Sequence, residues 1–513
     1  MLHLPPPTPS DLQRAKQLQE RFARSFAASN DDRNAPRTVV IVPSLTLDQE
    51  VLARISGVHH YEERQLCMLL LLRFPRTRVI YLTSMPIAES IIDYYLHLLP
   101  GIPAQHARRR LTLISCDDAS PHPLTEKLLA RPRVLQRIRE AIPDPGIAHM
   151  TCFTVTDLER ALGIALDLPV YGCDPSLYHL GTKSGSRKIF REAGLEVPAG
   201  YEDLANAECV GAALVELKKQ RPELERAVVK LNDGFSGEGN AIFDYRGAPD
   251  DSGLATWVKQ RLPKLLFEAS GMTWKLYSEK FLAMGGVVEE FVEGVDKRSP
   301  SAQLRIDPTG MIEAVSTHDQ LLGGGNAQIF LGCRFPADDS YRMEIQDRGL
   351  KVAKALAGHG ALGRFSVDFL SVRKPDGGWR HVAIEINLRK GGTTHPFLML
   401  QSLTDGHYCR DTGLFLTPGG EPRYYYASDN LESELYRGLL PFDLIDIAAM
   451  NRLHFHGTNQ EGVAFHLMGA LSEFGKLGIV CIGASYDRAE AYYRETVDIL
   501  NKEGKAWLRN GGQ

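Results

Sequence analysis

Two strand-like stretches stand out in the second half of this chain, Gly363-Arg364-Phe365-Ser366-Val367-Asp368-Phe369-Leu370 and His381-Val382-Ala383-Ile384-Glu385-Ile386-Asn387. Both are rich in β-branched and aromatic residues, and the intervening Pro375-Asp376-Gly377-Gly378 is typical of a turn. We therefore expect an antiparallel hairpin.

The register of this hairpin determines which polar side chains meet. If the turn is centred between Asp376 and Gly377, Asp368 lies directly opposite Glu385, with Cβ atoms roughly 4.5 to 5.5 Å apart. Asn387 points to the same face, because side chains alternate along a strand.

Two carboxylates and an amide oxygen on one face of apolar strands resist burial unless a cation neutralises them. Oxygen ligands without His or Cys favour Mg²⁺ or Mn²⁺ over zinc. We therefore expect a metal site at Asp368, Glu385 and Asn387. The alternative is that these residues face solvent on a half-exposed sheet.

A second feature is a lysine inside an apolar strand, Lys230 in Val228-Val229-Lys230-Leu231, followed by a glycine-rich turn, Gly234 to Asn240. Glycines let backbone N–H groups approach and hold phosphate oxygens. An ordinary hairpin turn is the alternative, since a chain with 46 glycines contains such turns by chance. The sequence contains neither a Walker A motif nor the protein kinase motifs.

The rest of the chain suggests three domains, as its length of 513 residues allows. Short strands alternate with helices in the first part, which predicts a parallel α/β domain of Rossmann-like type over residues 1–180. Strands and hairpins dominate an α+β domain over 181–423. A helix near Gly462 to Phe474, a strand from Gly478 to Ile482 and a final helix from Ser485 predict a small α/β domain over 424–513.

Composition excludes several classes of protein. With 59 Lys and Arg against 63 Asp and Glu, the formal charge is −4, and no basic block stands out, which disfavours a nucleic-acid partner. The eight cysteines are scattered singly, as expected for reduced thiols rather than a zinc or redox site. The apolar runs are too short to span a bilayer, so we expect no membrane partner and a cytoplasmic protein.

The features above occur in the order seen in the ATP-grasp superfamily: Lys183 before a helix, Lys230 before the glycine-rich turn, Val288-Glu289-Glu290-Phe291-Val292, and finally Glu385-Ile386-Asn387-Leu388-Arg389, which resembles the E-x-N-x-R signature. The C-terminal Gly462-Val463-Ala464-Phe465-His466-Leu467 also resembles pheganomycin-type peptide ligases.

The resemblance implies an ATP-grasp fold and a nucleotide site. Lys183 and Lys230 would contact ATP phosphates, and the strand Glu289, Glu290, Phe291 and Val292 would link two lobes as a hinge near 289–293, its backbone reading the adenine edge. Asp296 would stand in for the ribose-binding carboxylate. The turn would close over the phosphates as a lid. The turn residues included in the site are Gly234, Ser236, Gly237, Glu238 and Gly239.

Arg389 would stabilise charge on the transferring phosphoryl group, a surface ion pair being the alternative. Arg364 and Arg298 are candidates for holding a substrate carboxylate, with a structural salt bridge as the alternative for each. His318 and Gln320 are candidates for the acceptor site, together with Gly323-Gly324-Gly325. For His454, His456 and His466, a satisfied histidine is a better interpretation than a metal site.

The resemblance therefore implies an ATP- and Mg²⁺-dependent ligase that joins a carboxylate to an amine through an acyl phosphate. Ligases of this type are often homodimers. Two alternatives remain open at this point: a regulatory protein that keeps the ATP-binding shell, and another phosphoryl-transfer enzyme on the same fold.

Overall fold

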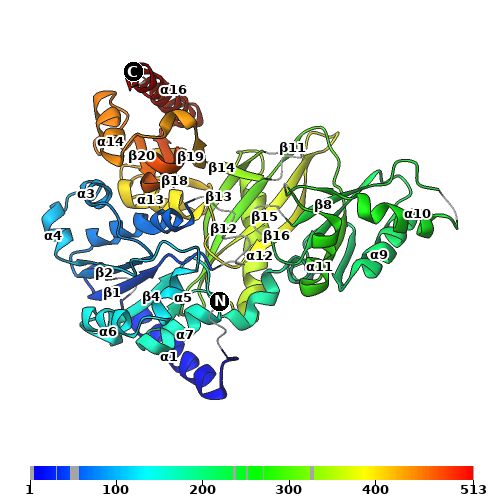
Figure 1. Ribbon diagram of the computed structural model, residues 1–513, viewed down its shortest axis with the longest axis horizontal. Helices are drawn as coiled ribbons and strands as arrows, with labels where there is room; N and C mark the ends of the chain where they lie inside the picture. The colour runs from blue at the N-terminus through cyan, green and yellow to red at the C-terminus, as the bar shows by residue number, and fades with distance from the viewer. Residues whose placement is uncertain are drawn as a thin grey trace.

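The computed structural model describes residues 5–29, 32–46, 57–234, 239–249, 252–269, 271–323 and 329–511. Within these ranges the strands form a parallel sheet near the N-terminus, a small sheet in the middle of the chain, and a large antiparallel sheet between them (Figure 1). The predicted combination of α/β and α+β architecture is confirmed. No helix in the described part of the chain is long and apolar enough to cross a membrane.

The N-terminal sheet is parallel throughout, in the order β3-β2-β1-β4-β5. Its central strands β1 and β2 are almost wholly buried, because helices cover both faces of a parallel sheet. The strands are β1 (Arg37–Val42), β2 (Thr77–Thr83), β3 (Leu111–Ser115), β4 (Ala148–Cys152) and β5 (Val170–Tyr171). The helices are α1 (Pro9–Ser29), η1 (Val58–Arg73), α3 (Glu89–His97), α4 (Ala104–Arg108), α5 (Leu124–Leu129), α6 (Pro132–Ala141), η2 (Pro145–Ile147) and α7 (Asp157–Leu166).

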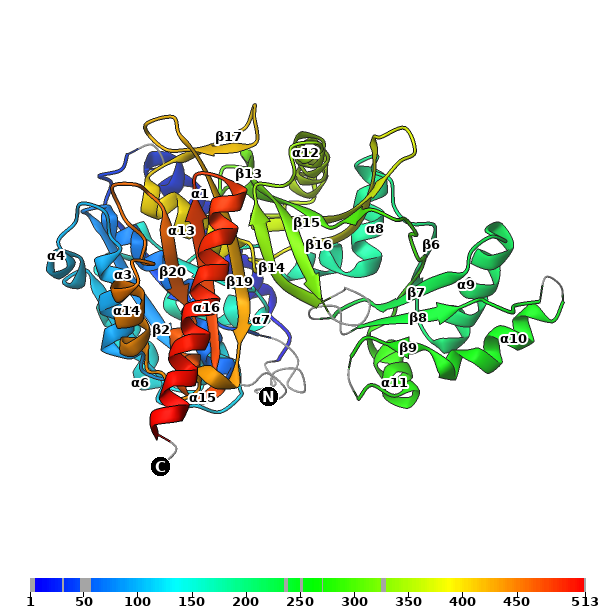
Figure 2. The ribbon, with the colours of Figure 1, turned by 90° about the horizontal axis from the view of Figure 1, so that it is seen from above.

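The small sheet has the order β6-β10-β7-β8-β9 and stands apart from the rest of the molecule, with α9 to α11 packed against it (Figure 2). Two helical segments, η3 (Pro175–Gly181) and α8 (Lys183–Glu192), lead into it. Its strands are β6 (Gly200–Leu204), β7 (Arg226–Leu231), β8 (Asn240–Asp244), β9 (Leu266–Phe267) and β10 (Gly286–Glu290). Its helices are α9 (Ala207–Gln220), α10 (Leu254–Arg261), η4 (Leu262–Lys264) and α11 (Trp274–Met284).

The large sheet carries the predicted hairpin as β15 (Gly363–Arg373) and β16 (Trp379–Asn387). The long helix α12 (Arg342–Gly358) packs on one face of this sheet and buries Val352 and Leu356 with the apolar side of β15. The remaining elements of this region are β11 (Lys297–Arg298), β12 (Pro300–Ile306), β13 (Ile312–Gly323), β14 (Ile329–Phe335), α13 (Thr394–Thr404), β17 (His407–Cys409) and β18 (Leu414–Leu416).

The C-terminal segment continues the same sheet, because β14 pairs with β19 (Pro422–Glu432) and β19 pairs with β21 (Lys476–Gly483). The predicted boundary at residue 423 therefore falls within a strand, and the division into three domains remains a proposal. The other C-terminal elements are η5 (Glu434–Tyr436), α14 (Pro441–Met450), β20 (Gly462–His466), η6 (Met468–Ala470), α15 (Leu471–Phe474) and α16 (Tyr486–Gly511).

The helix predicted near Gly462 to Phe474 is wrong in its first half. Residues Gly462–His466 form β20, and the only α-helical turn in this stretch is Leu471–Phe474. β20 pairs along its whole length with β21, and all five of its residues are buried. A short run that is apolar on both faces does not distinguish a strand from a buried helix, and pairing with β21 decided the outcome.

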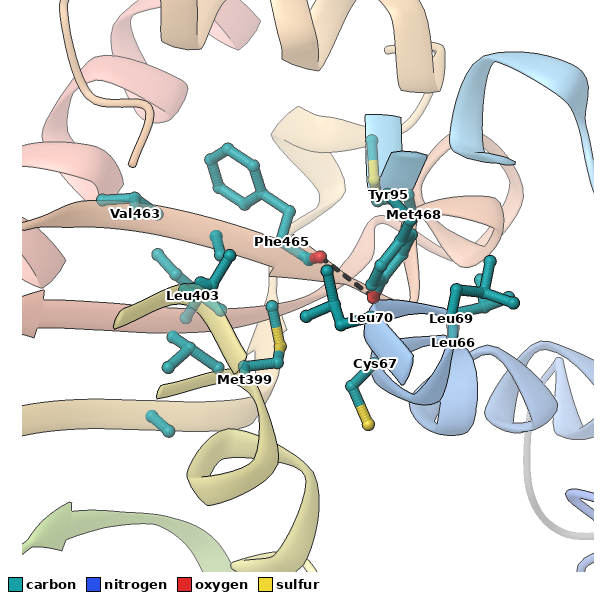
Figure 3. Packing of buried hydrophobic residues seen from close by; sticks show 14 of the residues in the cluster. Leu66, Cys67, Leu69, Leu70, Tyr95, Met399, Leu403, Val463, Phe465 and Met468 are labelled. Carbon is teal, nitrogen blue, oxygen red and sulfur yellow. Dashed lines mark hydrogen bonds between the residues drawn. The ribbon is translucent and has the colours of Figure 1, made fainter. Parts of the chain in front are cut away.

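The N- and C-terminal parts of the chain share one hydrophobic core. Leu66 and Leu70 of η1 belong to the same cluster as Val463 and Phe465 of β20, and Leu70 lies near Phe465 (Figure 3). Tyr95 of α3 donates a hydrogen bond to the Phe465 carbonyl at 3.3 Å. Burying each such apolar side chain stabilises the folded state by about 1.5–3 kcal/mol. The N-terminal and C-terminal segments of the chain are therefore packed against each other through this shared core.

Candidate active site

A cavity of about 760 Å³ lies between the small sheet and the large sheet. Lys230 and Glu289 line it from the small sheet, and Asp368 and Glu385 line it from the hairpin. The strand predicted as a hinge, Glu289 to Val292, also lines it. The cavity thus brings together residues that the sequence places more than 100 positions apart.

The hairpin pairs Asp368 with Glu385, as predicted. The predicted turn centre was wrong, because Arg373 pairs with Trp379 and the turn is therefore centred on Asp376. A β-bulge at Ile384 restores the expected register beyond it, since Asp368 pairs with Glu385 and Phe369 with Ala383.

The bulge also changes which side chains face the core. Ala383 and Ile386, three positions apart, both lie in the hydrophobic core with Val367 and Phe369. In a regular strand, side chains that share a face are an even number of positions apart. The extra residue therefore leaves both Ile384 and Glu385 at the wall of the cavity.

The charges at the hairpin are unbalanced. Burial and the neighbouring Glu385 raise the pKa of Asp368 to about 6, and Asn387 Nδ2 donates a hydrogen bond to Asp368 Oδ2 at 3.0 Å. Burial also opposes ionisation of Glu385, but the nearby Lys183 ammonium outweighs it, and the pKa of Glu385 lies below its usual value. The site thus has two adjacent carboxyl groups and an amide, and one of the carboxyl groups resists ionisation. Such a set of ligands fits a hard divalent cation such as Mg²⁺.

Lys183 is held in place by the start of α8. Thr182 caps the helix, with Gly185 N donating to Thr182 Oγ1 at 3.0 Å. Asn232 ties this helix end to β7, because its side chain accepts from Ser184 N and its carbonyl accepts from Lys183 N, both at 3.0 Å. Asn232 was not among the predicted residues, although its position between the Lys230 strand and the glycine-rich turn was an available signal.

Lys230 belongs to a buried ion cluster. Its Nζ lies 2.5 Å from Glu289 Oε2, and Arg187 Nη1 donates to Glu289 Oε1 at 2.7 Å. The charges of Lys230 and Arg187 outweigh the burial of Glu289 and lower its pKa. The Glu289 side chain is thus committed to this cluster, and Glu290 Oε1 accepts from Ala199 N at 3.1 Å. Arg187 was not among the predicted residues, because a mid-helix arginine usually faces solvent.

Two glycines of the predicted lid are described. A Cβ on Gly234 would come within 3.3 Å of the Gly239 backbone, so the two ends of the turn are in close contact. The predicted residues Ser236, Gly237 and Glu238 lie outside the described part of the chain, as do Gly324 and Gly325.

The other predicted residues divide between the cavity wall and its surroundings. Arg298 lines the cavity and pairs with the half-exposed Asp296, its Nε lying 3.1 Å from Asp296 Oδ1. Gln320 also lines the cavity. His318 does not, because it is fully buried and contacts the Tyr425 hydroxyl, and burial lowers its pKa to about 3. A role for His318 in direct contact with a substrate is therefore not supported.

A second cavity of about 180 Å³ adjoins the same carboxylates on the side of the N-terminal sheet. Arg389 lines it together with Arg64 of η1, Phe153 and Gln320. The Arg64 guanidinium lies 4.8 Å from the centre of the Tyr61 ring and 4.9 Å from that of Phe153, and Nη1 donates to Asp429 Oδ2 at 3.1 Å. Arg64 is thus rigidly held at the cavity wall, and no local motif marked it.

Arg364 lies on β15, four positions before Asp368, and lines neither cavity. Burial and the neighbouring Arg305 lower its pKa to about 10. Arg364 therefore contributes positive charge near the N-terminal sheet rather than a contact at the carboxylates.

Comparisons with known proteins agree with this arrangement. Residues 175–250 and 250–408 match the family model described as IQCH-like, ATP-grasp, and residues 443–496 match the PGM1 C-terminal domain. The chain is 30% identical over 476 residues to an L-propargylglycine–L-glutamate ligase of Streptantibioticus cattleyicolor, covering 90% of this chain and 94% of that protein. It is 24% identical over 454 residues to IQ motif-containing protein H of Danio rerio, covering 79% of this chain and 43% of that protein.

Two solved structures share the fold over almost the whole chain. A biotin carboxylase from Campylobacter jejuni in a β-γ-ATP complex is 13% identical with a TM-score of 0.54, covering 93% of this chain and 96% of that one. The biotin carboxylase domain of the Hydrogenobacter thermophilus 2-oxoglutarate carboxylase, in complex with MgADP, is 12% identical with a TM-score of 0.54, covering 93% and 95%. At these identities the likeness concerns the fold alone.

Proposed function

The chain belongs to the ATP-grasp family and is an ATP-dependent carboxylate–amine ligase, and we propose that it joins a small amino acid, through its carboxylate, to the amine of a second amino acid or a peptide. The observation that carries this proposal is the pair of adjoining cavities, which meet at Asp368 and Glu385. A nucleotide fits the larger cavity and a small acid the smaller one, with their reacting ends at the shared carboxylates.

The larger cavity has the polarity that ATP requires. Val228, Phe291 and Ile384 supply apolar surface for the base, whereas Lys183, Lys230 and the carboxylates supply charge for the phosphates. In this proposal Gly234 and Gly239 hold the turn that covers the phosphates, the backbone of Glu290 to Val292 binds the adenine edge, and Asp296 or Arg298 contacts the ribose.

Asp368, Glu385 and Asn387 would hold Mg²⁺, with Mn²⁺ as a substitute, and the ion would neutralise charge on the phosphates. Lys183, now paired with Glu385, is close enough to neutralise part of the remaining charge. Arg389 would bind the oxygens of the phosphoryl group as it is transferred.

The reaction follows from the need to replace a poor leaving group. A carboxylate oxygen attacks the γ-phosphorus and ADP leaves, which gives an acyl phosphate. The amine nitrogen then attacks the acyl carbon, the C–O bond to phosphate breaks, and the amine loses a proton as the amide forms. The chain's own contribution is to hold the reactants in line and to exclude water from the acyl phosphate.

The smaller cavity limits the size of the acid. Arg64 and Arg389 supply two guanidinium groups for a carboxylate, and Phe153 with Phe330 supplies an apolar wall. The relative from Streptantibioticus cattleyicolor acts on L-propargylglycine and L-glutamate, which supports an amino-acid substrate of similar size here. The cytoplasmic location, the homodimer and the absence of nucleic-acid partners also remain proposals.

The test is a phosphate-release assay with ATP and Mg²⁺ against single amino acids and pairs of them, with mass spectrometry of the products. We expect release only when an acid and an amine are both present, together with a product mass lower by one water than the sum of the two. Glu385→Ala should abolish acid-dependent ADP formation. ATP turnover by Glu385→Ala at the wild-type rate would refute the assigned metal ligands, and a phosphorylated acid as the final product would refute amide formation.

A further inference from the structure

Three side chains of metal-binding type converge deep in the molecule, outside the two cavities. His395 of α13, Asp429 of β19 and His466 of β20 are all buried. The Nε2 atoms of His395 and His466 lie 3.0 Å apart, and Asp429 Oδ1 lies 3.0 Å from the first and 2.8 Å from the second. Two imidazole nitrogens and one carboxylate oxygen therefore form a nearly equilateral triangle.

Hydrogen bonds cannot satisfy all three sides of this triangle. A neutral imidazole carries a single N–H, on one of its two nitrogens. If both Nε2 atoms carry their proton and donate to Asp429 Oδ1, the two N–H groups crowd each other across 3.0 Å. If one Nε2 is unprotonated, its lone pair faces the carboxylate oxygen. The ion pair with Arg64 favours the ionised form of Asp429. With this carboxylate ionised, each arrangement of the imidazole protons leaves one side repulsive, and such a contact in a buried cluster is costly.

A divalent transition-metal ion would satisfy all three sides together. Metal–nitrogen distances of about 2.0–2.1 Å and metal–oxygen distances of about 2.0–2.2 Å place ligand atoms about 3 Å apart when the ligand–metal–ligand angles are near 90–95°. Imidazole nitrogen combined with one carboxylate oxygen favours Zn²⁺ or a similar first-row ion over Mg²⁺.

The surroundings hold the three ligand atoms in place. Arg64 Nη1 binds Asp429 Oδ2 at 3.1 Å, which orients the carboxylate and leaves Oδ1 for the triangle. A Cβ on Gly478 would lie 2.2 Å from both Cδ2 and Nε2 of His466, so the absence of a side chain there makes room for the ring. A cavity of about 10 Å³, the size of one water, borders His395 and Arg64.

We propose that His395, Asp429 and His466 bind a divalent first-row transition-metal ion, separate from the Mg²⁺ ligands of the active site. The ligands come from three elements, and Figure 3 shows two of these elements in contact, with Leu403 and Met399 of α13 near Val463 and Phe465 of β20. α13 begins directly after Gly391 to Thr393, which line the smaller cavity. The ion therefore links β19 and β20 to the helix that follows the wall of the smaller cavity, and its role is structural.

The test uses the full-length protein without a histidine tag, loaded with Zn²⁺ or Co²⁺ and then dialysed against metal-free buffer. We expect about one ion to be retained per chain, a thermal midpoint that falls when a strong chelator removes it, and an X-ray absorption spectrum with two imidazole ligands. Less than a tenth of an ion per chain, or a spectrum without imidazole, would overturn the proposal. Both results come from the wild-type chain and require no variant to fold.

Variants locate the ion. His466→Ala and Asp429→Asn should lose at least nine-tenths of the bound metal, whereas a His454→Ala, His456→Ala double variant should keep it, because these two nearby histidines are exposed. Glu385→Gln should also keep it, which separates this site from the active-site carboxylates. Retention of the ion by a folded His466→Ala variant would refute the assignment.

Discussion

Asp368→Asn is expected to stabilise the metal-free protein while it inactivates the enzyme. The pKa of Asp368 rises from its usual 3.8 to about 6 because of burial and the adjacent Glu385. This difference corresponds to roughly 3 kcal/mol between the ionised and neutral forms. Asp368 keeps part of its surface exposed in the cavity, and part of that cost is screened. We therefore expect the neutral amide to stabilise the fold by about 1–2 kcal/mol at pH 8.

The sign of this effect depends on pH. Below about pH 4 the carboxyl group is protonated in both the folded and the unfolded chain, so the variant and the wild type should unfold at similar midpoints. Between pH 4 and 6 the folded chain alone retains the proton, so the wild type loses stability as pH rises through this range. The advantage of the variant should grow over that window and become constant above it.

The assay is urea or thermal unfolding at pH 4, 5, 6 and 8 without divalent metal, repeated with Mg²⁺ and ATP. Mg²⁺ and ATP should stabilise the wild type and reverse the order of the two proteins, and ligase activity of the variant should fall by about 10²–10³-fold. Asp376→Asn is the control, since this exposed turn residue has a lowered pKa and should show no gain at pH 8. The reasoning would be refuted if the variant unfolded at a lower midpoint than the wild type at pH 8 and the difference between the two midpoints were the same at pH 4.

Three further predictions concern nucleotide binding and transfer. Lys230→Gln should weaken ATP binding by about ten- to a hundredfold in a fluorescence titration, because it removes a charged hydrogen-bond donor, whereas exposed Lys188→Gln on α8 should not. Gly185→Ala should weaken ATP binding more than tenfold, because its Cβ would lie 1.9 Å from a backbone carbonyl and displace the start of α8. Gly358→Ala is the control, and it should bind ATP normally because the space around this glycine is open. Arg389→Lys should lower kcat by about 10²-fold with a smaller change in ATP affinity; an unchanged kcat would place Arg389 outside the transfer step.

Local pattern was sufficient for the hairpin and for the helix that presents Lys183. Alternation of apolar residues predicted that Asp368 faces Glu385, and the pairing is confirmed. The predicted turn centre was one half-residue off, and the bulge at Ile384 compensated for it. A bulge depends on how both faces of a strand pack, which a single strand's pattern does not encode.

The same limit applies to the strand Gly462–His466. Its residues are apolar on both faces, and such a run is compatible with either a helix or a strand. Pairing with β21 on one side and packing against η1 and α13 on the other selected the strand.

Residue patterns alone were sufficient to predict the parallel N-terminal sheet, the pairing of Asp368 with Glu385 and the ATP-grasp family, because these depend on short-range periodicity, turn residues and ordered motifs. The lysines and carboxylates proposed for the nucleotide site come from the same motifs. Only the tertiary structure brought Arg64 of η1 to the smaller cavity, Arg187 to Glu289, and His395 to Asp429 and His466. The hydrogen bond from Arg64 to Asp429 joins residues 365 positions apart. Such contacts arise when separate elements bury their apolar faces in shared cores, and no local pattern specifies which polar side chains then meet.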